Sequence, residues 1–144
     1  MKKKMIALFA VTLLLTSTTF ANGEPSLEIK KEFSQTFTQA SEAKWEEEST
    51  FYKVTFLEGG QYLTAFYNPS GEFESLSRNI STAMLPLALQ KDLQGKLQNA
   101  WITDSFELSG KNGTEYYVTL ENANEKTMYR SGSTNWSIYN KIQK

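Results

Sequence analysis

The side chains with catalytic potential in this chain of 144 residues are carboxylates, because it contains no cysteine and no histidine. These absences exclude a Ser-His-Asp triad, a Cys-His pair, a histidine-ligated zinc and a CxxC redox motif. A glycoside hydrolase needs two carboxylates about 5–10 Å apart in a cleft. Candidate pairs are Glu72 with Glu74 and Asp104 with Glu107. Alternating strand positions place such acids in solvent more simply, so we expect that the protein is not an enzyme.

Two further patterns are typical of binding sites but have simpler interpretations. The run Glu46-Glu47-Glu48 resembles part of a calcium site, yet no EF-hand spacing surrounds it, so a solvated strand or loop is favoured. Gly59-Gly60 is a turn rather than a phosphate-binding loop, because the rest of such a motif is missing. The sequence therefore predicts no metal and no cofactor.

The first 21 residues have the organisation of a secretory signal peptide. Lys2-Lys3-Lys4 precedes an apolar run over residues 5–15, and Thr19-Phe20-Ala21 suits cleavage after Ala21. The run is shorter than the ~20 residues that span a bilayer, so cleavage is favoured over a membrane anchor. We expect a signal peptide at 1–21 and a mature domain at 22–144, periplasmic or secreted and not bound to a membrane.

The mature chain is mildly acidic. Loss of the three lysines takes the formal net charge from −1 to −4, and no basic stripe remains. We therefore expect no nucleic-acid partner. The content of hydrophobic residues, 40%, is sufficient for a folded core.

Residues 51–80 are predicted to form three consecutive antiparallel strands with turns at Gly59-Gly60 and at residues 68–71. Two glycines tolerate the positive φ angles of a tight hairpin, which pairs Leu57 with Tyr62 and Val54 with Ala65. Alternation then gives one apolar face, suited to the core, and one mixed face.

Two amphipathic helices are expected on the apolar side. The first covers about residues 27–40, with an apolar stripe of Ile29, Phe33, Phe37 and Ala40. The second begins at Pro86, because proline suits the first turn of a helix, and has the stripe Leu89, Leu93, Leu97 and Ala100.

A second set of strands follows the second helix. Residues 102–108 alternate as a strand, and a three-residue turn at 111–113 would match Leu108 to Tyr116 and Phe106 to Val118. The next turn would set Glu121 opposite Lys126 and Tyr117 opposite Arg130.

The two halves share this order of elements, which suggests an internal repeat over 26–82 and 83–144. Trp45 parallels Trp101, residues 53–56 parallel 117–120, and Phe73 parallels Trp136. We therefore predict an α+β fold of two helix-plus-antiparallel-strand repeats in one antiparallel sheet, with both helices on one face. Trp45 and Trp101 are interpreted as core residues.

Several segments together resemble one family. They are Phe33-x3-Phe37, Ala43-x-Trp45, residues 51–56, residues 63–67, Ser70-Gly71-Glu72, residues 77–81 and Leu85-Pro86. The chain is similar in these to the PepSY-like, beta-lactamase-inhibitor-like periplasmic proteins of Bacteroidota. Ser131-Gly132-Ser133-Thr134 departs from the Asp-x-x-Gly usual at the last turn of that family. The resemblance implies a helix-plus-antiparallel-sheet fold and a binding or inhibitory role, without catalytic residues.

The resulting hypothesis is a monomeric exported protein that binds, and inhibits or modulates, an exported enzyme through the uncovered sheet face. Tyrosine, methionine and arginine are enriched in interface cores. A structural or small-ligand-binding envelope protein is the alternative, and a carboxylate hydrolase is the weakest reading. The expected binding residues are Lys53, Tyr62, Phe66, Tyr117, Met128, Arg130 and Tyr139.

Overall fold

The computed structural model describes residues 24–144. One helix and four strands are followed by a short 3-10 turn, η1, and then by a second helix and four strands. The elements are α2 (Leu27–Thr36), β1 (Ser41–Glu47), β2 (Tyr52–Glu58), β3 (Gln61–Tyr67), β4 (Phe73–Asn79), η1 (Thr82–Met84), α3 (Leu87–Lys96), β5 (Trp101–Gly110), β6 (Gly113–Glu121), β7 (Glu125–Ser131) and β8 (Trp136–Gln143).

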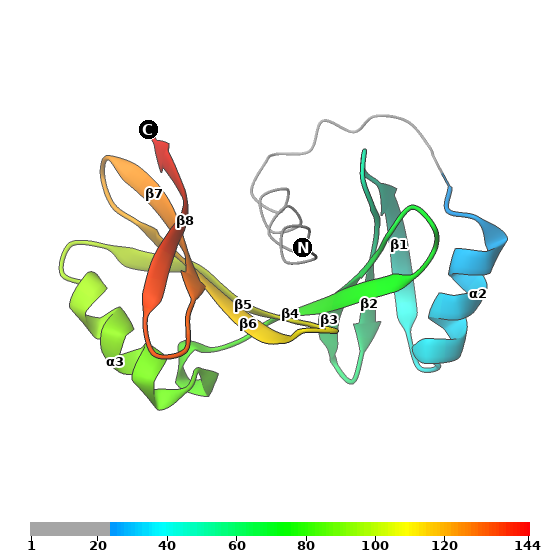
Figure 1. Cartoon of the computed structure of the whole chain (residues 1–144), viewed down its shortest axis with the longest axis horizontal. Coiled ribbons are helices and arrows are strands. Elements are labelled where there is room, and N and C mark those ends of the chain that lie inside the picture. Colours follow the sequence, from blue (N-terminus) through cyan, green and yellow to red (C-terminus); the bar gives the residue numbers. More distant parts are fainter. Residues whose placement is uncertain (1–23) are drawn as a thin grey trace.

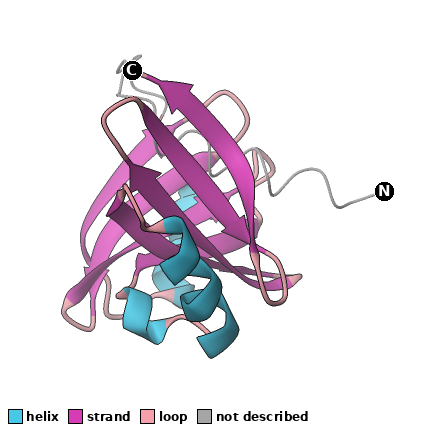
Figure 2. Ribbon diagram, turned by 90° about the vertical axis from the view of Figure 1, so that its left-hand side faces the viewer, coloured by secondary structure: helices cyan, strands magenta, loops and turns pink. Residues whose placement is uncertain are grey.

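All eight strands form one antiparallel sheet in chain order. Figure 1 shows that this sheet is curved and that both helices lie on its outer side. Figure 2 shows α3 across that outer surface. The predicted fold class, two helix-and-strand units in one sheet with both helices on one face, is therefore confirmed.

The first hairpin has the predicted register, with Leu57 opposite Tyr62 and Val54 opposite Ala65. Its turn residues Gly59 and Gly60 have φ angles of 60° and 80°. These are the values of the tight turn whose twist matches that of antiparallel strands. Local turn chemistry thus sets the pairing of β2 with β3.

Helix α2 is shorter than predicted. Ser26 caps its start by accepting a hydrogen bond from the N–H of Ile29, and Phe37 is already the C-cap residue. The chain then forms the edge strand β1, of which the sequence left only the acidic end, Glu46-Glu47, open between a strand and a loop. Phe37 still packs against the core beneath α2.

Helix α3 begins directly after Pro86, as predicted, and buries Leu89 and Leu93. Two hydrogen bonds connect it to the last strand. The indole N–H of Trp136 donates to the carbonyl oxygen of Leu89 at 2.9 Å, and the backbone N–H of Trp136 donates to the Asp92 carboxylate at 2.8 Å. The final strand is therefore positioned by the second helix.

The buried side chains form three clusters that alternate between the faces of the sheet. Two lie under the helices on the convex face, which we call the helix face. One packs Ile29 and Phe33 on Val54 and Phe56, and the other packs Leu89 and Leu93 on Val118 and Leu120. The third, the concave cluster, consists of Phe51, Phe66, Phe106, Leu108, Tyr117 and Met128.

The predicted pairing of β5 with β6 is wrong by one residue. Leu108 lies opposite Glu115 and Phe106 opposite Tyr117, because only Lys111 and Asn112 separate Gly110 from its partner Gly113. A slip of one residue moves side chains to the other face of a sheet. Phe106 and Leu108 therefore lie on the concave face with Tyr117, not on the helix face with Val118. The predicted pairs of Glu121 with Lys126 and Tyr117 with Arg130 are confirmed.

The two equivalent tryptophans have different environments. Trp45 packs against Phe33, with ring centroids 5.3 Å apart, as expected for a core residue. Trp101 is 53% exposed, so its interpretation as a core residue is wrong. An irregularity between Ile102 and Asp104 interrupts the alternation of β5. Such a bulge re-aims the side chains at the end of a strand.

Candidate functional site

The residues predicted to bind a partner do gather on the concave face, but they differ in accessibility. Phe66, Tyr117 and Met128 are only 1%, 0% and 1% exposed, so the expectation that they are exposed is wrong. Tyr62 is 59% exposed. The remaining three predicted residues, Lys53, Arg130 and Tyr139, are half-buried.

The buried members form an ordered aromatic floor. The rings of Phe106 and Tyr117 stack with their centroids 5.0 Å apart and an interplanar angle of 7°. Tyr139 meets Tyr117 edge-on at 5.5 Å. Offset-stacked and edge-on pairs are the favoured arrangements of aromatic rings. Tyr139 of β8, predicted as a binding residue, therefore packs against this floor and is not a fully exposed side chain.

An ionic group flanks this floor on the side of β7. Glu115 accepts a hydrogen bond from the hydroxyl of Tyr117 at 3.0 Å and pairs with the guanidinium of Arg130. Burial, followed by the nearby Glu115 carboxylate, raises the pKa of Tyr117 well above its ordinary value. The hydrogen bond to Glu115 raises the pKa of Arg130. Tyr117 is thus a neutral hydrogen-bond donor and Arg130 a fixed cation at any physiological pH.

Lys53 is the cation at the other end of the concave face. Its Nζ lies 2.6 Å from a carboxylate oxygen of Glu46 and 3.8 Å from one of Glu48. The acidic run considered as a calcium site thus pairs with a lysine. Within residues 24–144 no group of three or more acidic side chains is arranged to hold a metal ion.

The carboxylate pairs considered for hydrolysis do not face each other across a cleft. Glu72 and Glu74 both accept hydrogen bonds from the Asn68 amide at a surface turn, at 3.0 and 3.1 Å. Asp104 pairs with Thr119 and Glu107 with Tyr116, so these two acids point to opposite faces of the sheet. Glu107 pairs with Arg78 on the helix face.

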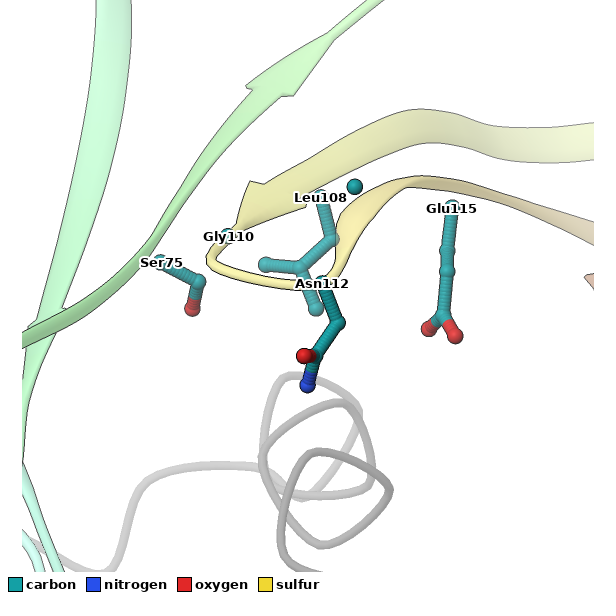
Figure 3. Close-up of a pocket in the computed structure, with 6 residues that line it drawn as sticks. Ser75, Leu108, Gly110, Asn112 and Glu115 are labelled. Carbon is teal, nitrogen blue, oxygen red and sulfur yellow. The ribbon is translucent and has the colours of Figure 1, made fainter. Parts of the chain in front are cut away.

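Two hollows differ in what they can hold. The one in Figure 3, beside Ser75, Leu108, Gly110, Asn112 and Glu115, has a volume of about 20 Å³. This is room for about one water molecule. A second hollow, shallow and wide open to solvent, has a volume of about 410 Å³ and lies where β4 ends beside β5. It is lined by Asn79, Ile80, Thr82, Ile102, Thr103, Asp104 and Ser105.

This second hollow was not found by sequence reasoning, which treated Asp104 only as half of a hydrolytic pair. A signal was present, because Asp104 occupies one of the alternating positions held otherwise by Ile102, Phe106 and Leu108. A carboxylate in an apolar series marks a position where the core ends or a polar site begins.

Neither α2 nor α3 has the length and hydrophobicity of a membrane-spanning segment. The predicted signal peptide lies outside the described residues.

No protein-family model matches the chain, and no curated protein matches it by sequence. Solved structures do share its fold. A BLIP-like protein from Bacteroides fragilis has a TM-score of 0.68 at 18% identity, over 85% of this chain and 89% of that one. A DUF2874 family protein from Bacteroides uniformis gives 0.72 at 10% identity, over 82% and 88%. A "putative periplasmic" protein from Bacteroides eggerthii gives 0.74 at 9% identity, over 84% and 90%. The resemblance to beta-lactamase-inhibitor-like proteins of Bacteroidota is therefore confirmed at the level of the fold.

Proposed function

We propose that this chain is an exported, non-catalytic binding protein that captures an exported enzyme through the concave face of its sheet and modulates or inhibits it. The observation that carries the proposal is the placement of both helices on the convex side. Within residues 24–144, the concave side carries aromatic and ionic side chains but no helix. A concave surface of this kind is complementary to a protruding loop of a folded partner.

The chemistry of the concave face supports recognition of a protein. Tyrosine and arginine carry a large share of the binding energy at interfaces. Tyr62 is accessible here, while Arg130 and Tyr139 stand at the margin of a packed aromatic floor. Because the floor is held by ring stacking and by the pair of Glu115 with Arg130, little ordering is required when a partner docks. The predicted signal peptide supports an exported partner.

Capture by the mature chain tests this proposal. The chain beginning at Asn22 is immobilised, incubated with periplasmic and secreted fractions of its native host, and the retained proteins are identified by mass spectrometry. We expect the double variant Tyr62→Ala/Tyr139→Ala to lose a specific partner. The matched control is Leu87→Ala/Ile138→Ala, which removes two side chains that are 66% and 59% exposed, from α3 and from the helix face of β8.

Binding by purified components, measured by calorimetry, then separates capture from indirect association. If the concave and control variants bind the partner equally well, the concave face is not the interface. Activity of the captured enzyme, with and without the chain, tests inhibition. The expected monomeric state remains a prediction and is measured by light scattering of the same samples.

A further inference from the structure

Strands β5 and β6 are joined by a tight turn that contains an Asn-Gly pair. Only Lys111 and Asn112 separate Gly110 from its strand partner Gly113. Gly113 has a φ of 108° and open space where a Cβ would stand. Asn112 is exposed, and its side chain makes no hydrogen bond within the described part of the chain. The amide group of Asn112 is therefore uncommitted and accessible to solvent.

An asparagine that precedes glycine undergoes a reaction that is slow at other asparagines. The backbone nitrogen of the following residue attacks the carbonyl carbon of the asparagine side chain and closes a five-membered ring. A side chain on the following residue crowds this nitrogen, whereas glycine has none and its backbone reaches the conformations that ring closure requires. The pairing of Gly110 with Gly113 must open for this step, and the tip of a hairpin opens at a low cost in free energy.

The other asparagines of the described chain lack this combination. Asn122 also lies in a turn, but its Oδ1 accepts hydrogen bonds from the backbone N–H groups of Asn124 and Glu125 at 2.9 and 3.0 Å. The residue after Asn122 is an alanine. A second Asn-Gly pair in the sequence, Asn22-Gly23, lies outside the described residues. Within residues 24–144, Asn112 is the one asparagine that precedes a glycine.

The turn lies beside the concave face, where a new charge would act on groups that are already paired. Asn112 lines the hollow of about 20 Å³ together with Ser75 and Glu115. Figure 3 shows that the side chains of these three residues project to the same side. Glu115 accepts the hydrogen bond of the Tyr117 hydroxyl and pairs with Arg130. A carboxylate in place of the Asn112 amide would therefore repel Glu115 and attract Arg130.

We propose that Asn112-Gly113 is a site of spontaneous deamidation, which converts the folded chain into an acidic form with an altered concave face. The backbone nitrogen of Gly113 bonds to Cγ of Asn112, the Cγ–Nδ2 bond breaks, and ammonia leaves with the proton that the backbone nitrogen loses. Water then opens the ring at Cγ, which gives aspartate, or at the backbone carbonyl carbon, which gives isoaspartate and inserts a methylene into the main chain. Both products add a negative charge, and water is the only other reactant. No partner takes part, so the inference does not rest on the proposed function.

Incubation of the mature chain at neutral pH, sampled over several weeks, tests the proposal. Each sample is digested, and peptide mass spectrometry follows at every asparagine the mass increase that accompanies replacement of an amide by a carboxyl group. We expect conversion at Asn112 to be at least about tenfold faster than at Asn122. A synthetic peptide of residues 109–116 is the unfolded reference, and it should react faster than the folded chain because it has no strand pairing to open. Equal rates at Asn112 and Asn122 in the folded chain would overturn the proposal.

Variants then assign the acidic form, measured by isoelectric focusing in a chain that carries Asn22→Ser so that the second Asn-Gly pair contributes nothing. Asn112→Gln keeps an amide but would need a larger ring, so the acidic form should disappear, whereas the matched control Asn122→Gln leaves it unchanged. The purified acidic form should show amide NMR shifts at Ser75 and Glu115, because both line the hollow beside the new charge. An acidic form that persists in Asn112→Gln, or shifts confined to the turn itself, would contradict the proposal.

Discussion

Tyr117 offers the sharpest test of whether the concave cluster belongs to the folded core. Its side chain is 0% exposed, stacks on Phe106 and is capped edge-on by Tyr139. The contrasting residue is Tyr62, on the same face, which is 59% exposed and donates to the carboxylate of Glu42 at 2.6 Å. Replacing each by alanine removes the same number of atoms from a buried and from an accessible position.

The expected magnitudes follow from these environments. Removal of a buried aromatic ring lowers the free energy of unfolding by about 3–5 kcal/mol. The paired ring of Phe106 accounts for about 0.5–1.5 kcal/mol of this. Tyr117→Phe removes only the hydroxyl that donates to Glu115 at the edge of the cluster, so a loss of about 1 kcal/mol is expected. Tyr62→Ala should cost less than about 1 kcal/mol, as exposed substitutions do.

Urea denaturation of the mature chain, followed by tryptophan fluorescence, measures all three variants against the unmodified protein. A double-mutant cycle of Phe106→Leu and Tyr117→Leu isolates the coupling between the two rings. If Tyr117→Ala costs under about 1 kcal/mol, as Tyr62→Ala does, the cluster contributes nothing to the core and is an accessible surface instead. Such a result would refute the division of the concave face into a buried floor and an exposed margin.

Three other perturbations have defined outcomes. Trp136→Phe removes the indole N–H that donates to the carbonyl of Leu89 in α3 and should lower the free energy of unfolding in urea by about 1 kcal/mol; an unchanged midpoint would contradict the role given to this bond. Gly60 has a φ of 80° and open space around its Cα, so Gly60→Ala should cost about 1–2 kcal/mol through backbone strain alone and Gly60→Asn clearly less. The raised pKa of Asp104 means that its ionised form opposes folding, so stability decreases as pH rises from its unfolded pKa, about 3.9, through its folded one. Asp104→Asn should therefore melt higher than the unmodified chain at pH 7, with a difference that disappears in acid; a constant difference at all pH values would assign the effect to packing.

The central hairpin and the start of the second helix were predictable because their determinants are local. Two adjacent glycines allow a turn with positive φ at both positions, and this turn alone sets the register of β2 with β3. Likewise, the start of α3 follows from the fixed φ of Pro86. Each prediction depended on residues within a few positions of the feature, which is the range over which sequence patterns are informative.

The pairing of β5 was less predictable because it depends on features without a unique sequence signal. Residues 110–113 fit a loop of three residues or of two, and the structure has two, with Gly113 at a φ of 108° inside the pair. The bulge between Ile102 and Asp104 has no proline or glycine to mark it. Because of these two ambiguities, Phe106 and Leu108 were predicted on the wrong face, and the hollow beside Asp104 was not predicted.

The burial along β3 and β6 indicates that the middle of the concave face is buried rather than open. A strand with one wet face alternates in burial, but Ala65, Phe66 and Tyr67 of β3 are buried consecutively, and so are residues 117–120 of β6. Such runs require a core on both faces at the middle of the sheet. The helices supply that core on the convex side, and the mutually packed concave cluster supplies it on the other. A partner that docks on the concave side therefore contacts the margin of the cluster, at Tyr62, Arg130 and Tyr139, while Phe66, Tyr117 and Met128 fix the shape of the surface on which it rests.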